Sequence, residues 1–153
     1  MLYNRPLRCD CGYREVKELI TLEQYRGKDP LGILFEERAK DLLVKVNSLL
    51  QDLGFTAIIM TSGFRSPQHN AAVGGAKASK HCEAQAIDLA DNDRKIGAAL
   101  MANLGKVKSR GMALEDLRYC EKANGNRWVH LQSVLPKSGN TVFIPYAGAP
   151  RIT

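Results

Sequence analysis

The sequence lacks the segments that would place a chain in or across a membrane. No apolar run approaches the ~20 residues that a membrane span needs, so we expect no span. The stretch Met1–Cys9 has no apolar h-region of a signal peptide. We therefore expect a protein that is made in the cytoplasm and carries no export signal of its own. A substrate outside the cytoplasm would have to be reached by another route.

Cysteine is scarce, and its spacing excludes a common structural metal site. The four cysteines do not form the paired CxxC spacing of a zinc ribbon. Cys9 and Cys11 could join a metal site, form disulfides or stay reduced. Without an export signal, reduced thiols are favoured.

Long runs of one charge are also missing, although the net charge is +6. The basic residues are scattered, with no run of five or more and no interleaved aromatic residues. This pattern argues against a nucleic-acid partner and favours a solvated basic surface. Such a surface still suits polyanionic surroundings, including an anionic cell wall.

The length of 153 residues fits one domain with a core of its own. Helical and strand patterns are mixed without regular βαβ alternation, so the predicted fold class is α+β, with a small antiparallel sheet and flanking helices. We assign residues 1–30 to an N-terminal extension that contains Cys9 and Cys11, and residues 31–146 to the core. We expect a monomer.

The clearest element is an amphipathic helix over residues 31–53, whose apolar positions recur at three- and four-residue steps and which Gly54 ends. The other predicted elements are a short helix within 15–25, a buried strand at 55–61, a short helix at 67–72, a strand at 85–90, a helix from 91 or 92 to 104 ended by Gly105, a hairpin of 118–121 and 127–133 turning at Asn124-Gly125, and an edge strand at 141–146 that Pro145 terminates.

The stretch from Thr61 to Asp88 contains most of the residues that could carry chemistry. In an unbroken strand, His81 and Asp88 would lie roughly 23 Å apart. They can share one ion only if the chain bends between them, which the small residues Ala84 and Ala86 permit. A carboxylate in so apolar a run needs a partner. A salt-bridged aspartate and a surface histidine remain the alternative on spacing alone.

His130 is the third candidate ligand. It alternates with Val129 and Leu131, which suit the core, so His130 should face a cleft. Two histidines and one carboxylate with an open fourth position form the ligand set of a hydrolytic zinc site. A hydrogen-bonded, half-buried histidine is the alternative.

Several short motifs occur in a specific order between residues 55 and 133. They are Ser-Gly-Phe-Arg65, His69-Asn70, Val-Gly-Gly75, Ser79-x-His81, Ala86-x-Asp88 and Trp-Val-His130. In this order they resemble the zinc D-Ala-D-Ala carboxypeptidase family. That family includes D,D- and L,D-peptidases that cut peptidoglycan, many of them phage-encoded, and it shares its fold with the Hedgehog signalling domain.

The resemblance implies a role for each matching position. His81, Asp88 and His130 would bind Zn2+. Arg65 would contact the substrate carboxylate or the developing oxyanion, and its guanidinium could do so through two hydrogen bonds. Ser79 would orient the site by hydrogen bonding and belong to the substrate-binding group. His69 competes as a metal ligand, but we assign it a structural or surface role.

The chain departs from the family pattern at two positions. Ala84 stands where glycine is usual, which is a mild change. Arg127 stands three residues before the last histidine, where a glutamate or aspartate is usual. A general base must take the proton of the attacking water. We expect Glu121 to supply it, because Tyr119-Cys-Glu121 resembles the Tyr-x-Glu of Hedgehog-type relatives; Glu115 and Asp116 are the fallbacks.

The resemblance implies a zinc peptidase that cleaves peptidoglycan stem peptides or crossbridges, released to the cell wall or carried in a phage particle. Arg127 supports an alternative, a catalytically impaired, zinc-binding structural or wall-binding module of a phage particle. A third hypothesis is a thiol-based site that uses Cys82 beside His81. No suitably spaced second histidine or CxxC supports it.

Overall fold

The computed structural model describes residues 17–145. The expectations for Cys9, Cys11 and Tyr146 therefore lie outside the described residues. The described helices are α1 (Leu22–Arg26), α2 (Ile33–Asp52), α3 (Pro67–Ala72), α4 (Lys95–Ala102), α5 (Leu104–Ser109) and the 3-10 helices η1 (Lys80–Glu83) and η2 (Leu117–Tyr119); the strands are β1 (Met60–Ser62), β2 (Ala86–Ala90), β3 (Ala113–Glu115), β4 (Trp128–Gln132) and β5 (Val142–Phe143).

The strands form one sheet in the order β1-β2-β4-β3-β5. Every neighbouring pair is antiparallel except β3 and β5, which run parallel. The predicted α+β class is confirmed, and so is the predicted edge strand near the C-terminus, which appears as β5. Within residues 17–145, no helix is long and apolar enough to cross a membrane.

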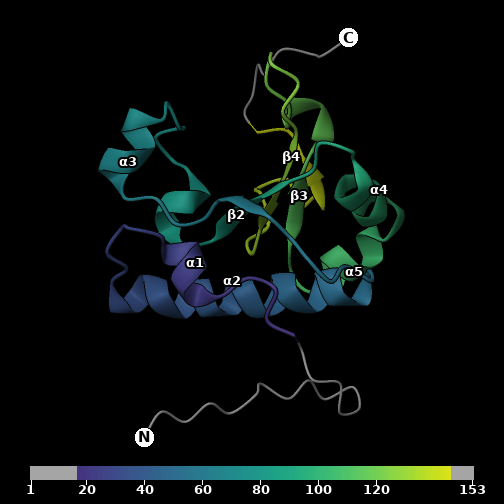
Figure 1. Ribbon diagram of the computed structural model, residues 1–153, viewed down its shortest axis with the longest axis horizontal. Coiled ribbons are helices and arrows are strands. Elements are labelled where there is room, and N and C mark those ends of the chain that lie inside the picture. The colour runs from purple at the N-terminus through teal and green to yellow at the C-terminus, as the bar shows by residue number, and fades with distance from the viewer. Residues whose placement is uncertain (1–16, 146–153) are drawn as a thin grey trace, which may run out of the picture.

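Helix α2 packs against one face of the sheet and runs along one side of the molecule, with α4 and α5 near one end and α3 near the other (Figure 1). Its apolar stripe is buried, as the sequence predicted, and Gly54 follows with a positive φ of 85°. The sheet contributes the alternate residues of its strands to this core. The buried residues shared by α2 and the sheet include Leu42, Val46, Leu49, Ile87, Leu89, Leu114, Val129 and Leu131.

Three predicted elements differ in the structure. The strand expected at 55–61 is only β1, and Ile59 is 73% exposed, because this segment leads into an edge strand that pairs on one side. The helix expected up to Leu104 ends at Ala102, and α5 then continues through Gly105, so that glycine does not stop a helix. The hairpin arm at 118–121 forms only an isolated bridge between Glu121 and Arg127.

Residues 17–30 pack into the core, although the sequence assigned them to an extension. Only α1 is helical there, beginning after Thr21, whose side chain caps it. Ile20 and Tyr25 are each 1% exposed. The side chain of Asn47 on α2 accepts from the backbone of Leu19 and Ile20 and donates to the Ile20 carbonyl. The spacing of apolar residues in the sequence does not predict hydrogen bonds of this kind between distant segments.

Candidate metal centre

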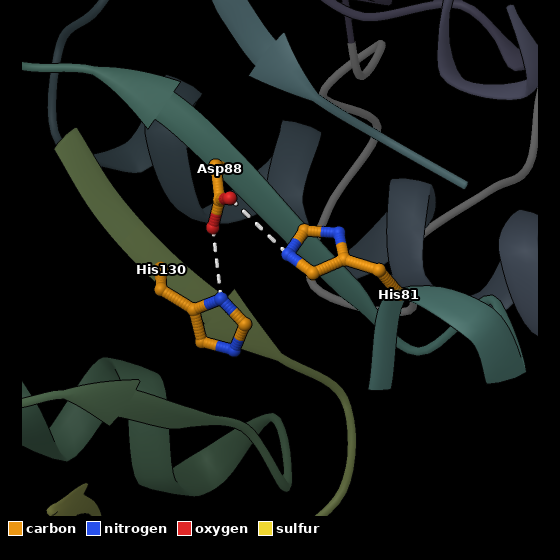
Figure 2. Close-up of side chains that lie close together, drawn as sticks. All are labelled: His81, Asp88 and His130. Carbon is orange, nitrogen blue, oxygen red and sulfur yellow. Dashed lines mark hydrogen bonds and ion pairs between the residues drawn. The ribbon is translucent and has the colours of Figure 1, made fainter. Parts of the chain in front are cut away.

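His81, Asp88 and His130 converge on one point, and Figure 2 shows the carboxylate between the two imidazole rings. His81 Nε2 lies 3.2 Å from Asp88 Oδ2, and His130 Nδ1 lies 2.8 Å from Asp88 Oδ1. One ligand atom from each residue falls within 4.8 Å of the others. His81 and Asp88 are buried and His130 is half-buried. Among residues 17–145 this is the group of histidine and acidic side chains that could hold a metal ion.

The bend required between His81 and Asp88 is present. His81 lies on η1, which the Ser79 side chain caps by accepting from the His81 amide at 3.3 Å. Ala84 then adopts a left-handed conformation with φ 55°, and β2 begins at Ala86. This turn brings His81 back toward the strand that carries Asp88. Ala84 is therefore at a position that favours glycine, which explains why glycine is usual there in the family that the sequence resembles.

The far side of the His81 ring is fixed by the backbone. Its Nδ1 lies 2.8 Å from the Gly63 carbonyl, so the ring donates there and Nε2 faces Asp88. Gly63 can be only glycine, because a Cβ would lie 2.2 Å from the Tyr25 carbonyl oxygen. The same carbonyl accepts from the Phe64 amide at 2.9 Å. The Ser-Gly-Phe-Arg motif thus orients a histidine far along the chain.

The sheet register places a row of polar side chains on the face opposite α2. Ser62 pairs with Asp88, and Asp88 pairs with His130. On the other side of β4, Ala113 pairs with Gln132 and Leu114 with Leu131, so the next residue, Glu115, is in register with His130. Paired residues on neighbouring strands point to the same face. We call Ser62, Asp88, His130 and Glu115 the polar row.

Arg65 makes three side-chain hydrogen bonds, two of them to this row. Its Nε donates to Ser62 Oγ at 2.8 Å, one terminal nitrogen to Asn70 Oδ1 at 3.3 Å and the other to Asp88 Oδ2 at 3.3 Å. Asn70 is 4% exposed and is itself held by donating to the Ala76 carbonyl. The sequence reading missed the roles of Ser62 and Asn70, although both belong to the motifs that it singled out.

The ionisation of the triad is set by its neighbours. Burial opposes the charge on Asp88, but hydrogen bonds from His130 and His81 hold the pKa of this carboxyl well below its usual range. Burial likewise disfavours charge on His130, yet the Asp88 hydrogen bond and the nearby Glu115 leave the pKa of His130 raised. An ionised carboxylate between two imidazole nitrogens is the donor set that zinc binds.

The three candidate bases lie in different surroundings. Glu115 is half-buried at the end of β3, and burial raises its pKa. Glu121 is exposed, and its Oε2 lies 3.2 Å from Arg127 Nε. Asp116 caps η2 and is bound to Arg118, whose hydrogen bonds lower the pKa of Asp116. The structure therefore brings Glu115 into the polar row, and not Glu121 or Asp116.

A cleft of about 650 Å³ opens beside the polar row. Ser62, Arg65 and Asp88 line it, whereas Ser79 does not, so in this structure Ser79 positions His81 instead. The remaining lining includes Arg26, Lys28, Asp29, His69, Lys122, Arg127 and Trp128. A peptide lying in this cleft would reach Asp88 and Arg65 together.

His69 and Cys82 lie outside the triad. His69 is on α3, and its Nδ1 lies 3.0 Å from Asp29 Oδ2. That carboxylate also accepts from the Ser66 amide, which gives His69 the structural role expected for it. Burial raises the pKa of the Cys82 thiol, which disfavours the thiolate that a nucleophilic site would require.

An α+β sheet that brings two histidines and a carboxylate together, with the carboxylate lining a cleft, is the framework of a metal-dependent hydrolase. The chain belongs to the peptidase M15 family, the zinc D-Ala-D-Ala carboxypeptidase family, whose sequence profile matches residues 16–132. It is accordingly a metallopeptidase of a family that depends on a metal, typically zinc, and acts on peptidoglycan-type substrates. No curated protein matches the chain.

Proposed function

We propose that the protein is a zinc-dependent peptidase that cleaves stem peptides or crossbridges of peptidoglycan, with Glu115 as its general base. The observation that carries the proposal is the polar row, which aligns Asp88, His130 and Glu115 on adjacent strands. His81, Asp88 and His130 would hold the zinc ion. When bound, zinc would supply Lewis-acid polarisation of the scissile carbonyl and acidify the attacking water.

Glu115 suits the task of moving the proton. A base works best when its pKa lies near the operating pH, and burial raises the pKa of Glu115 toward that range. It would accept the proton of the attacking water and pass it to the leaving amine. Glu121, which the sequence favoured, is exposed and ion-paired to Arg127 across the same hairpin. We therefore prefer Glu115 to Glu121.

Arg65 would bind the substrate carboxylate or the oxyanion that develops during the reaction. Its guanidinium lines the cleft while Ser62 and Asn70 fix its orientation. Donors that are oriented in advance stabilise developing charge without reorganisation during the step. Ser79 would act indirectly, because its contact is with the His81 amide.

The alternative of a catalytically impaired phage module rested on Arg127 at the usual position of the base. Arg127 no longer supports this alternative, because Glu115 on β3 can supply a carboxylate to the row from another strand. The net charge of +6 favours attraction to an anionic wall. On this proposal the enzyme acts at the cell wall, as a carboxypeptidase or an endopeptidase, after release from the cell or delivery by a phage particle.

The test combines a metal assay with product analysis. Purified protein should contain about one zinc ion per chain by mass spectrometry and should release new muropeptides from purified cell walls, resolved by chromatography. Removal of zinc by a chelator should abolish release, and added zinc should restore it. A zinc-loaded protein that binds walls and cleaves none of their peptides would contradict the proposal.

A further inference from the structure

The cleft carries an excess of positive charge, of which the proposed reaction uses only Arg65. Among residues 17–145, five cationic side chains line it, against two acidic ones; the cations are Arg26, Lys28, Arg65, Lys122 and Arg127, and the acids are Asp29 and Asp88. The chain as a whole has 22 basic and 16 acidic residues, so the cleft lining has a higher ratio of basic to acidic residues than the whole sequence. Both acids are already engaged, Asp29 by Ser66 and His69 and Asp88 in the triad.

We propose that Lys122 and Arg127 form a second anion subsite that binds a second carboxylate of an acidic peptide, distinct from the one held by Arg65. The inference rests on the proposed function and extends it to substrate selectivity. Arg65 needs its three protein partners and serves the reaction centre. Lys122 and Arg127 lie instead on the hairpin that precedes β4, at another part of the same cleft.

The two side chains have unused capacity for an anion. Among residues 17–145, the acidic partner of Arg127 is Glu121, which approaches the Nε edge and leaves the terminal nitrogens of the guanidinium without an acid. No acid within the same described part of the chain pairs with the Lys122 ammonium. Because both side chains line the cleft, a carboxylate that binds there could accept hydrogen bonds from the terminal nitrogens of the guanidinium and from the ammonium.

The hairpin that carries the subsite is fixed before any ligand binds. The Lys122 amide donates to the Asn126 carbonyl at 2.9 Å, and the Arg127 amide donates to Asn92 Oδ1 at 2.9 Å. The Arg127 carbonyl accepts from the Asp91 amide at 3.0 Å. A site carried on an ordered backbone loses less conformational freedom on binding than one on a mobile segment.

The distance to the reaction centre sets where the second carboxylate must lie. Arg127 precedes His130 by three residues of nearly extended chain, roughly 10 Å at about 3.4 Å per residue. An extended peptide covers that distance with about three residues. The subsite therefore selects peptides whose second carboxylate lies about two or three residues from the scissile bond.

The single tryptophan gives a direct binding signal that needs no cleavage. Trp128 lines the cleft next to Arg127, and the sequence contains no other tryptophan. Its fluorescence would be titrated with two synthetic stem tetrapeptides, L-Ala-γ-D-Glu-L-Lys-D-Ala with the glutamate α-carboxylate either free or amidated. Both retain the terminal carboxylate available to Arg65, so the pair varies only the second anion.

The free acid should bind about tenfold more tightly than the amide, the range expected for a charge-assisted hydrogen-bonded contact. The double variant Lys122→Gln/Arg127→Gln should bind both peptides with the affinity of the amide. Lys108→Gln, which removes one positive charge from an exposed position on α5 outside the cleft, should keep the preference.

Equal affinity of the wild-type protein for the two peptides would overturn the subsite. A double variant that still binds the free acid more tightly than the amide would also overturn it. So would a double variant that binds both peptides more weakly by the same factor, because the loss of overall positive charge would then explain the result. The two proposals can fail separately. If the zinc-loaded protein cleaves no wall peptide but its preference for the free acid disappears in the double variant, the subsite is supported and the proposed reaction is contradicted.

Discussion

The polar row and the hairpin at 120–128 both border the cleft, but different forces hold them. The row alternates along its strands with core residues such as Ile87 and Val129, so packing against α2 fixes where its side chains point. The hairpin is mostly exposed and is held by hydrogen bonds. We therefore expect the proposed reaction to depend on the row, and the proposed selectivity for a second carboxylate to depend on the hairpin.

One side chain ties the hairpin to the rest of the fold. Arg94 donates to the carbonyls of Trp128, Leu117 and Cys120 at 2.8 to 3.0 Å. It emerges from the turn after β2 and has a positive φ of 61°. The row needs no such clamp because the strands pair directly with one another. Changes in the two regions should therefore affect different measurements.

The largest effect is expected from removing a ligand in the row. Asp88→Ala or His130→Ala should weaken zinc binding by more than the ~10–100-fold typical of losing an outer-shell partner, measured by chelator competition. His69→Ala should retain zinc, because His69 pairs with Asp29 outside the triad. Native zinc affinity in both ligand variants would show that the metal, if any, binds elsewhere.

The next largest effect separates the two glutamates. Glu115→Gln should lower turnover by about 10²–10⁴-fold with zinc still bound, whereas Glu121→Gln should stay within a few-fold of wild type. Because only the ionised carboxylate accepts a proton and burial raises the pKa of Glu115, kcat/KM should rise with pH through a pKa above the usual ~4.3. The opposite ranking of the two variants would make Glu121 the base.

Stability provides the control for that comparison. Burial disfavours the charged form of Glu115, so its folded-state pKa is raised and ionisation at neutral pH opposes folding. A neutral glutamine should therefore not lower the melting temperature at neutral pH. If Glu115→Gln instead unfolded the protein, its loss of turnover would say nothing about proton transfer, and Glu115→Asp would have to show partial activity.

A smaller effect should follow from loosening the hairpin. Arg94→Met leaves three carbonyls without their donor and should lower the free energy of unfolding by about 2–3 kcal/mol, measured by urea denaturation. Hydrogen exchange should rise in 120–128 more than in β2, and zinc affinity should hold. Arg118→Met, which removes an exposed arginine from η2, should leave the unfolding midpoint unchanged. Equally faster hydrogen exchange in 120–128 and in β2 would mean that the hairpin and the polar row do not unfold independently.

The features that the sequence predicted well are those determined locally. The stripe of α2, the cap at Ser66 before α3 and the strand carrying Asp88 all follow from neighbouring residues. The triad could be assembled because the motif order indicated which distant residues meet. In these cases the interactions that fix the residue involve the same residues that form the pattern in the sequence.

The position of Glu115 could not be predicted in this way, because it depends on strand register. The Asn124-Gly125 turn suggested that Glu121 lies opposite the arm that carries His130. In the structure η2 interrupts that arm, and the strand that pairs with β4 is β3. Similarly, the burial of Tyr25 depends on its hydroxyl donating to the Ala86 carbonyl, a contact between distant segments.

The smallest effects should distinguish the two regions at single backbone positions. Ala84→Gly relieves a left-handed alanine but removes a fully buried methyl group, and because the two terms oppose each other, the net change should stay within about 1 kcal/mol. Gly125→Ala in the hairpin adds a Cβ at φ 85° with no atom within 4 Å to pack against, so strain is uncompensated and unfolding should become easier by about 1 kcal/mol. Paired denaturation curves would measure both. A stabilising Gly125→Ala would show that the left-handed position in the hairpin is not strained by a Cβ. A loss well beyond 1 kcal/mol for Ala84→Gly would show that the packing of the Ala84 methyl group outweighs its strain.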